Sequence, residues 1–141
     1  MSKAIIVYWS STGNTEAMAK AIEKGLKEGG AEVALTEAGK ANAGVIEGYD
    51  LLAFGCPAMG DEALEEDEFE PFFKSLETGG KLSGKKVALF GSYDWGDGQW
   101  MRDWQKRTED AGAKVFDTGF IQQLEPDEAV CAEFGKRFAG F

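Results

Sequence analysis

Six consecutive small polar residues form the segment best suited to binding a ligand, Ser10-Ser11-Thr12-Gly13-Asn14-Thr15. They follow an apolar run typical of a buried strand and open a segment with helical spacing. N–H groups and hydroxyls at a helix start bind anions, whereas a plain N-cap needs only one such residue. The segment has no Lys or Arg, so it is not a P-loop. We predict that residues 10–15 hold one terminal phosphate.

A second loop, Gly55-Cys56-Pro57-Ala58-Met59-Gly60-Asp61-Glu62, combines a proline with a thioether. Pro57 fixes one backbone angle, and Gly60 can adopt the positive φ of a type II turn. The neighbours of Met59 are small or polar, which favours an outward-facing, polarizable side chain at a binding edge. The alternative, that Met59 folds back onto the core, is equally consistent with the sequence.

In a third loop, Gly91-Ser92-Tyr93-Asp94-Trp95-Gly96-Asp97-Gly98, two aromatic residues stand in a polar, glycine-rich turn. Neither Tyr93 nor Trp95 falls on the face of a predicted strand or helix, and rings at such an edge offer a stacking surface. The alternative is a loop packed by its own aromatic side chains. A phosphate cradle with a thioether and an indole could hold a flat heterocycle from both sides. Flavin mononucleotide (FMN) has both a phosphate and such a ring.

Alternating apolar patterns predict the elements that position these loops. Runs rich in β-branched and aromatic residues predict buried strands at residues 4–9, 32–36, 49–55, 86–91 and 115–121. Helical spacing predicts helices at residues 14–28 and about 69–76. Two further helices are indicated by apolar faces, Trp100, Met101, Trp104 and Ala111 in one and Val130, Phe134, Phe138 and Phe141 in the other. Residues 37–48 form a connection with room for a helical turn.

Strands that alternate with helices predict an α/β fold, a doubly wound sandwich with a five-stranded parallel sheet and helices on both faces. Right-handed crossovers favour the strand order 2-1-3-4-5 at this size. The 141 residues fit a single domain, residues 1–141. In such a sheet, ligands bind outside the carboxyl ends of the strands, at the switch point between strands 1 and 3. All three loops are predicted to meet there.

Composition narrows the possible functions. The formal net charge is -10, from 15 Lys and Arg against 25 Asp and Glu, which disfavours nucleic acid or an anionic membrane and favours a basic protein partner. Two distant cysteines and no histidine argue against zinc and Ser-His-Asp hydrolysis, and we expect no metal. Without a signal-peptide pattern or a membrane-length apolar run, we expect a cytoplasmic protein.

Residues 8–15, 55–61, 87–93 and 95–96 together resemble the FMN-binding segments of the short-chain flavodoxins, and the likeness runs from the first strand to the last helix. The resemblance implies a flavodoxin-like fold with FMN as cofactor. It implies that Ser10, Thr12, Asn14 and Thr15 hold the FMN phosphate together with loop N–H groups. Ser92 matches a further phosphate donor.

The resemblance also implies roles around the flavin ring. Met59 matches the residue on the inner face of the isoalloxazine, and Trp95 matches the aromatic stacked on its outer face. Gly60 matches a glycine whose carbonyl turns to accept a hydrogen bond from flavin N5–H in the semiquinone. Glu62 matches a carboxylate that bonds flavin N3–H. The other residues expected in the cofactor site are Ser11, Gly13, Pro57, Ala58, Asp61, Tyr93, Asp94 and Gly96.

The implied function is electron transfer by a low-potential carrier that moves one electron at a time on the semiquinone/hydroquinone couple of non-covalently bound FMN, and not an enzyme. Ser11 and Asp94 depart from the usual pattern, since relatives commonly have glycine there. Like charge and desolvation penalise an anionic hydroquinone beside an acidic protein, so we expect a low second potential. We hypothesise that Asp94 lowers it further.

Residues 61–70 contain seven carboxylates beside the predicted flavin edge. They predict either a solvated helix start or an acidic rim on which redox partner proteins dock through a basic surface. We expect the protein to be a monomer.

Two other functional classes use similar folds. An FMN-dependent reductase would need a nicotinamide site, and the sequence has no added segment to build one. A phosphoacceptor receiver domain needs acidic residues after strand 1 and an acceptor Asp after strand 3. Those positions carry Ser10-Ser11 and Cys56-Pro57, which excludes that class.

Overall fold

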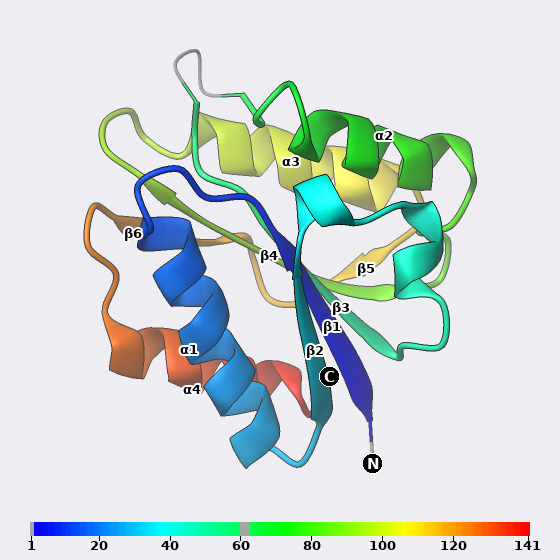
Figure 1. Ribbon diagram of the computed structural model, residues 1–141, viewed down its shortest axis with the longest axis horizontal. Coiled ribbons are helices and arrows are strands. Elements are labelled where there is room, and N and C mark those ends of the chain that lie inside the picture. The colour runs from blue at the N-terminus through cyan, green and yellow to red at the C-terminus, as the bar shows by residue number, and fades with distance from the viewer. Residues whose placement is uncertain (1, 60–62) are drawn as a thin grey trace.

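The computed structural model describes residues 2–59 and 63–141, which form a parallel sheet between two layers of helices (Figure 1). The strands are β1 (Lys3–Tyr8), β2 (Glu32–Glu37), β3 (Leu51–Gly55), β4 (Lys86–Tyr93), β5 (Lys114–Val115) and β6 (Phe120–Gln123). The helices are α1 (Asn14–Glu28), α2 (Phe69–Thr78), α3 (Gln99–Asp110) and α4 (Glu128–Phe138). Two 3₁₀ turns, Ala38–Lys40 and Ala43–Ile46, fill the connection before β3.

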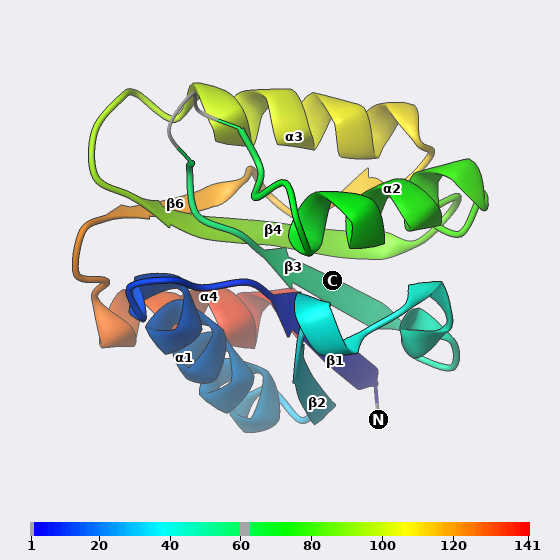
Figure 2. The same ribbon diagram turned by 45° about the horizontal axis from the view of Figure 1, so that its top comes forward.

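The sheet has the predicted order, β2-β1-β3-β4-β5, and its strand pairs are parallel. Helices α1 and α4 cover one face, and α2 and α3 cover the other (Figure 2). Strands β1, β3 and β4 are therefore buried on both faces, which is why their sequences are nearly continuous apolar runs. The predicted doubly wound α/β fold is confirmed.

The predicted fifth strand is wrong in one respect, because residues 115–121 do not form one continuous strand. Two short strands share one edge of β4: Val115 pairs with Val87, and Phe120 pairs with Phe90. The chain thus advances five residues where β4 advances three, and the excess loops outward around Asp117, whose φ is 55°. A left-handed non-glycine residue gives no apolar pattern, so the sequence did not reveal the break.

Several predicted boundaries and faces also shift. Strand β3 starts at Leu51, β4 extends to Tyr93, and α2 extends to Thr78. Val130 was predicted to face the core from the last helix, but it is 45% exposed, and Cys131 is buried instead. Asp127 caps α4 by accepting a hydrogen bond from the Val130 N–H, so Val130 lies in the first turn, and the buried face of the helix begins one residue later, at Cys131.

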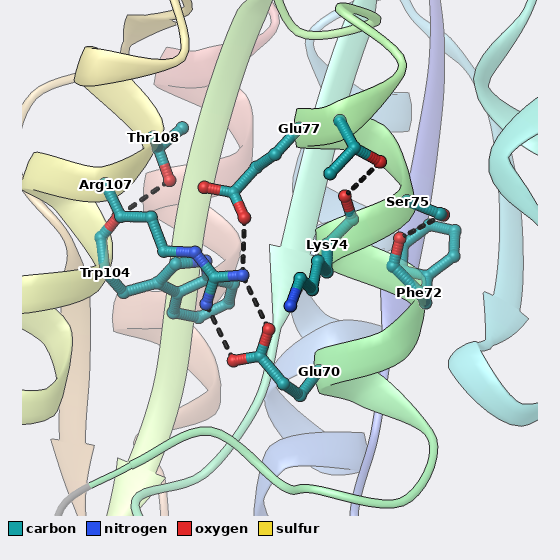
Figure 3. A network of polar contacts seen from close by, with 9 residues as sticks. Glu70, Phe72, Lys74, Ser75, Glu77, Trp104, Arg107 and Thr108 are labelled. Carbon is teal, nitrogen blue, oxygen red and sulfur yellow. Dashed lines mark hydrogen bonds and ion pairs between the residues drawn. The ribbon is translucent and has the colours of Figure 1, made fainter.

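Helices α2 and α3 are joined by a cluster of charges around Arg107 (Figure 3). The Arg107 guanidinium donates to both carboxylate oxygens of Glu70, at 2.7 and 2.6 Å, and also to Glu77. It lies over the Phe73 ring, 4.9 Å from the centroid. These bonds and charges keep the pKa of Arg107 above its ordinary value despite the opposing effect of burial. We call Arg107, Glu70 and Glu77 the α2–α3 clamp.

Within the part of the chain that the structure describes, none of the helices has the length and apolar character needed to cross a bilayer.

Candidate functional site

The loops that follow β1, β3 and β4 lie at one end of the sheet, as the fold requires for parallel strands (Figure 1). They enclose a cleft of about 240 Å³. Its lining comes from all three loops: Ser11, Thr12, Pro57, Ala58, Met59, Ser92, Tyr93, Asp94 and Trp95. The structure thus brings together most of the residues that the sequence predicted for the cofactor site.

The first loop is shaped by Ser10 and Gly13. The Ser10 Oγ accepts hydrogen bonds from the N–H groups of Gly13 and Glu16, both at 3.2 Å, and Gly13 has a φ of 98°. Because these bonds use the Ser10 oxygen only as an acceptor, its O–H proton stays available to a ligand.

The start of α1 keeps several donors open. The N–H groups of Thr12, Asn14 and Thr15 have no hydrogen-bond acceptor among the described residues. Open N–H groups at the positive end of a helix dipole suit an anion. The donors are neutral, so they fit one phosphate dianion, as predicted for FMN.

Two buried hydroxyls connect this loop to the third one. Thr15 Oγ1 and Ser92 Oγ lie 2.7 Å apart, and the two residues are only 1% and 5% exposed. The Ser92 carbonyl accepts a hydrogen bond from the Ala58 N–H at 3.0 Å, which attaches the second loop as well. The sequence predicted both hydroxyls near the phosphate, but not that they contact each other.

The second loop places Met59 at the cleft. Met59 is partly buried, lies outside the two hydrophobic cores, and its N–H bonds the Ala63 carbonyl at 3.0 Å. The prediction of a Met59 side chain at the binding edge therefore agrees with its place in the cleft lining. Gly60, Asp61 and Glu62, which were predicted to bind the flavin, lie outside the described residues.

The two aromatic residues of the third loop differ from each other. Trp95 is 64% exposed at the cleft, as expected for a stacking surface. Tyr93 was predicted to lie in the turn, but it ends β4 and packs against Trp100, with ring centroids 5.7 Å apart. Tyr93 thus packs against helix α3 and also lines the cleft.

The two departures from the family pattern fit the backbone. Positive φ values in the described non-glycine residues occur only at Asp117 and Leu124. Ser11 and Asp94 therefore do not adopt the conformation for which glycine is favoured. Positive φ falls instead on Gly13 and Gly96. The Asp94 side chain is exposed at the cleft, and its carbonyl accepts a hydrogen bond from Gln123.

Two of the carboxylates in the acidic segment 61–70, those of Glu65 and Glu68, have structural roles. The Glu65 carboxylate is 5% exposed and accepts hydrogen bonds from the N–H groups of Asp67, Glu68 and Phe69, which caps α2. Burial would raise the pKa of Glu65, but these three bonds keep it below its ordinary value. Glu68 accepts a hydrogen bond from the Trp9 indole at 2.9 Å. Sequence reasoning missed these contacts, since no local pattern marks them.

Two further titratable groups near the site are held in their neutral form. Burial and a hydrogen bond to Glu16, at 3.0 Å, raise the pKa of Tyr8 to about 12. Burial raises the pKa of Cys56 to about 12, which makes its thiol unreactive. Neither group is therefore a candidate for acid-base or nucleophilic chemistry.

The sequence model of one protein family, described as flavodoxin, matches residues 6–135. The chain belongs to the flavodoxin family. It is 54% identical over 136 residues to a flavodoxin of Clostridium beijerinckii, covering 95% of this chain and 97% of that one. It is 48% identical over 134 residues to a flavodoxin of Megasphaera elsdenii, covering 95% and 96%.

Solved flavodoxin structures agree with this assignment. The fold matches the solution structure of two-electron reduced Megasphaera elsdenii flavodoxin with a TM-score of 0.89, over 98% of this chain and 99% of that one, at 48% identity. It matches crystalline oxidised flavodoxin 1 from Bacillus cereus with a TM-score of 0.86, over 99% and 98%, at 29% identity. As a flavodoxin, the chain binds FMN and transfers electrons between redox proteins, and it is an electron carrier, not an enzyme.

Proposed function

We propose that residues 10–15 and Ser92 hold the FMN phosphate and that the flavin ring lies in the cleft between Met59 and Trp95. The open N–H groups of Thr12, Asn14 and Thr15 beside that cleft carry the proposal. Bound FMN supplies the redox chemistry, and the chain supplies its binding and its surroundings. Gly13 and Gly96 give the first and third loops the backbone that this arrangement needs.

Met59 and Trp95 would shield the two faces of the ring from water. A thioether and an indole both make favourable contacts with a flat aromatic surface. Pro57, Ala58 and Tyr93 complete the cleft walls, and Asp94 adds a negative charge at its rim. The roles proposed for Gly60, Asp61 and Glu62 rest on the family resemblance.

The surroundings favour a low reduction potential. The second electron leaves a negative charge on the flavin beside a protein of formal net charge -10. Like charges and the limited solvation between two large side chains both disfavour that addition. We propose that the protein accepts and donates electrons one at a time at low potential.

Redox partner proteins would dock with a basic surface of their own against the acidic rim of the cleft. Asp94 is an exposed carboxylate at the cleft, and Glu66 and Asp67 are exposed further along the chain, after the second loop, although Glu65, Glu68 and Glu70 are engaged within the chain. Complementary charge speeds the encounter of two proteins and makes it sensitive to salt. Electron transfer from a reducing partner should therefore slow as salt is added, and a salt-independent rate would contradict this docking surface.

We also propose that the protein is a single-domain monomer in the cytoplasm.

Reconstitution tests the cofactor site directly. The purified protein should be yellow, or the apoprotein should become so with one equivalent of FMN, and it should turn blue on partial reduction. Trp95→Ala should still bind the phosphate end of FMN but hold the ring less tightly, with flavin fluorescence quenched less. A colourless protein that takes up no FMN would contradict the proposal.

A further inference from the structure

Ser92 is the residue at which the three site loops meet. Its Oγ lies 2.7 Å from Thr15 Oγ1, at the start of α1. Its carbonyl accepts the Ala58 N–H of the second loop at 3.0 Å, and it pairs with Gln122 across the sheet. It also lines the cleft. A single side-chain hydrogen bond at Ser92 thus ties the loop at residues 10–15 to the loops around the proposed ring site.

The two buried hydroxyls carry one proton more than they can use between themselves. Each hydroxyl has one O–H donor, and only one of the two protons lies in the hydrogen bond between them. The second proton has no acceptor among the described residues. A buried donor without an acceptor is costly, and the open N–H groups of Asn14 and Thr15 lie beside it. A ligand whose oxygens only accept would satisfy all three donors.

We propose that Ser92 is a positioning residue for phosphate binding: its O–H donates to Thr15 Oγ1, which leaves the Thr15 O–H to donate to the phosphate. The proposal rests on the proposed function, and it replaces the direct phosphate contact of Ser92 by an indirect one through Thr15. Thr15 is the contact because its own open N–H places it at the helix start, where the anion binds. Binding of an anion strengthens both bonds, since hydrogen bonds in a chain polarise one another.

The consequence is that the two hydroxyls act as one unit. Without the Ser92 hydroxyl, Thr15 Oγ1 is free to rotate and its proton is no longer directed to the phosphate. Without the Thr15 hydroxyl, Ser92 has nothing to position. Independent phosphate donors would behave differently, because each would contribute whether or not the other was present.

The test compares FMN with riboflavin, which has the same ring but no phosphate. Dissociation constants are measured by quenching of flavin fluorescence for the full chain, Ser92→Ala, Thr15→Val and the double variant. Thr15→Val should weaken FMN binding on the order of ten- to a hundredfold, the scale of a hydrogen bond to a charged group. Ser92→Ala should weaken it less, the double variant no more than Thr15→Val, and riboflavin binding should change little in all three. Thr15→Ser, which keeps the hydroxyl, should restore FMN affinity.

A matched control is the buried Thr108, whose hydroxyl bonds the Trp104 carbonyl at 2.7 Å in α3 (Figure 3). Thr108→Val should lower the unfolding temperature of the apoprotein without changing the ratio of FMN to riboflavin affinity. The proposal is overturned if Ser92→Ala still weakens FMN binding in the Thr15→Val background. It is also overturned if riboflavin binding falls as much as FMN binding. If the unmodified chain bound neither FMN nor riboflavin, the result would instead contradict the proposed function itself.

Discussion

The loop at residues 10–15 and the α2–α3 clamp are both rich in polar groups, but they use them in opposite ways. In the clamp, Arg107 donates to two carboxylates and lies over an aromatic ring, so its charge is matched within the chain. In the loop, the N–H groups of Asn14 and Thr15 have no acceptor among the described residues. The polar groups of the clamp satisfy one another, whereas the open N–H groups of the loop are those that we propose bind a ligand.

This difference shows how polar groups can be assigned to stability or to binding. Groups that satisfy each other stabilise the fold, and their removal should lower the free energy of unfolding. Groups that stay open in a rigid frame are pre-organised for a ligand, and their disturbance should mainly lower the affinity for that ligand. Variants in the loop should therefore mainly change FMN affinity, and variants in the clamp should mainly change the free energy of unfolding.

The largest effect is expected for Gly13→Val in the loop. Gly13 has a φ of 98°, which a β-branched residue rarely adopts, so the loop must move and misalign its donors. FMN affinity should fall by about a hundredfold or more, since each hydrogen bond to a charged group contributes about 1.5–3 kcal/mol. Fluorescence titration of the apoprotein with FMN measures it.

Gly30→Val is the matched control, at the other end of the same helix. Gly30 has a φ of 95°, and at either glycine a Cβ would meet no heavy atom within 4 Å. The two variants should lose similar stability. Equal losses of FMN affinity would show that the loop has no special part in binding.

The next largest effect is expected for Arg107→Met in the clamp. Removing the guanidinium leaves Glu70 and Glu77 close together without a counter-charge, and the site is partly shielded from water. The free energy of unfolding should fall by about 2 kcal/mol, while FMN affinity stays the same. Lys106→Met, which breaks an exposed pair with Asp110 in the same helix, should cost less than about 0.5 kcal/mol. A hundredfold loss of FMN affinity in Arg107→Met would show that the clamp also contributes to binding, contrary to this division of roles.

Glu65 resembles the clamp, since its carboxylate is satisfied within the chain, and it gives a pH test. Its pKa is lower in the folded protein than in the unfolded chain, so its contribution is present above the ordinary carboxyl pKa and is lost as the pH falls through the folded value. Glu65→Gln should cost about 1.5 kcal/mol at pH 7, and the difference from the unmodified protein should shrink below about pH 4. Urea unfolding at several pH values measures it. Glu66→Gln, at an exposed neighbour, should cost less than about 0.5 kcal/mol at pH 7.

The smallest effect is expected at the exposed rim. Asp94→Asn removes one charge without changing the backbone, and a unit charge about 10 Å away in water contributes only about 0.4 kcal/mol. The potential for adding the second electron should rise slightly, and added salt should reduce the rise. Potentiometric titration measures this. If only Asp94→Gly raised the potential and Asp94→Asn did not, the backbone rather than the charge would be responsible.

The fold and most of the cleft could be predicted because their signals are local. Strands buried on both faces, such as β1, β3 and β4, are continuous apolar runs, and the polar residues between strand and helix stand out against them. The break between β5 and β6 was missed, because it depends on the left-handed backbone of Asp117.

The contacts that distinguish structural from binding groups were beyond sequence reasoning. Glu68 and Trp9 are hydrogen-bonded although they are 59 positions apart in the sequence, and Ser92 and Thr15 although they are 77 positions apart. Seven carboxylates in the segment 61–70 suggested either a solvated helix start or a docking rim, whereas in the structure Glu65 caps α2 and Glu70 belongs to the clamp. Charge and composition alone cannot show which groups find a partner in the folded chain.

The most direct test of the central claim is an NMR comparison of backbone amide shifts in the FMN and riboflavin complexes. The two ligands differ only in the phosphate, so the shift difference locates the phosphate site. We predict that the difference is largest at Thr12, Asn14 and Thr15 and absent from Arg107 in the clamp. A difference spread evenly over the chain, or centred away from residues 10–15, would contradict the account.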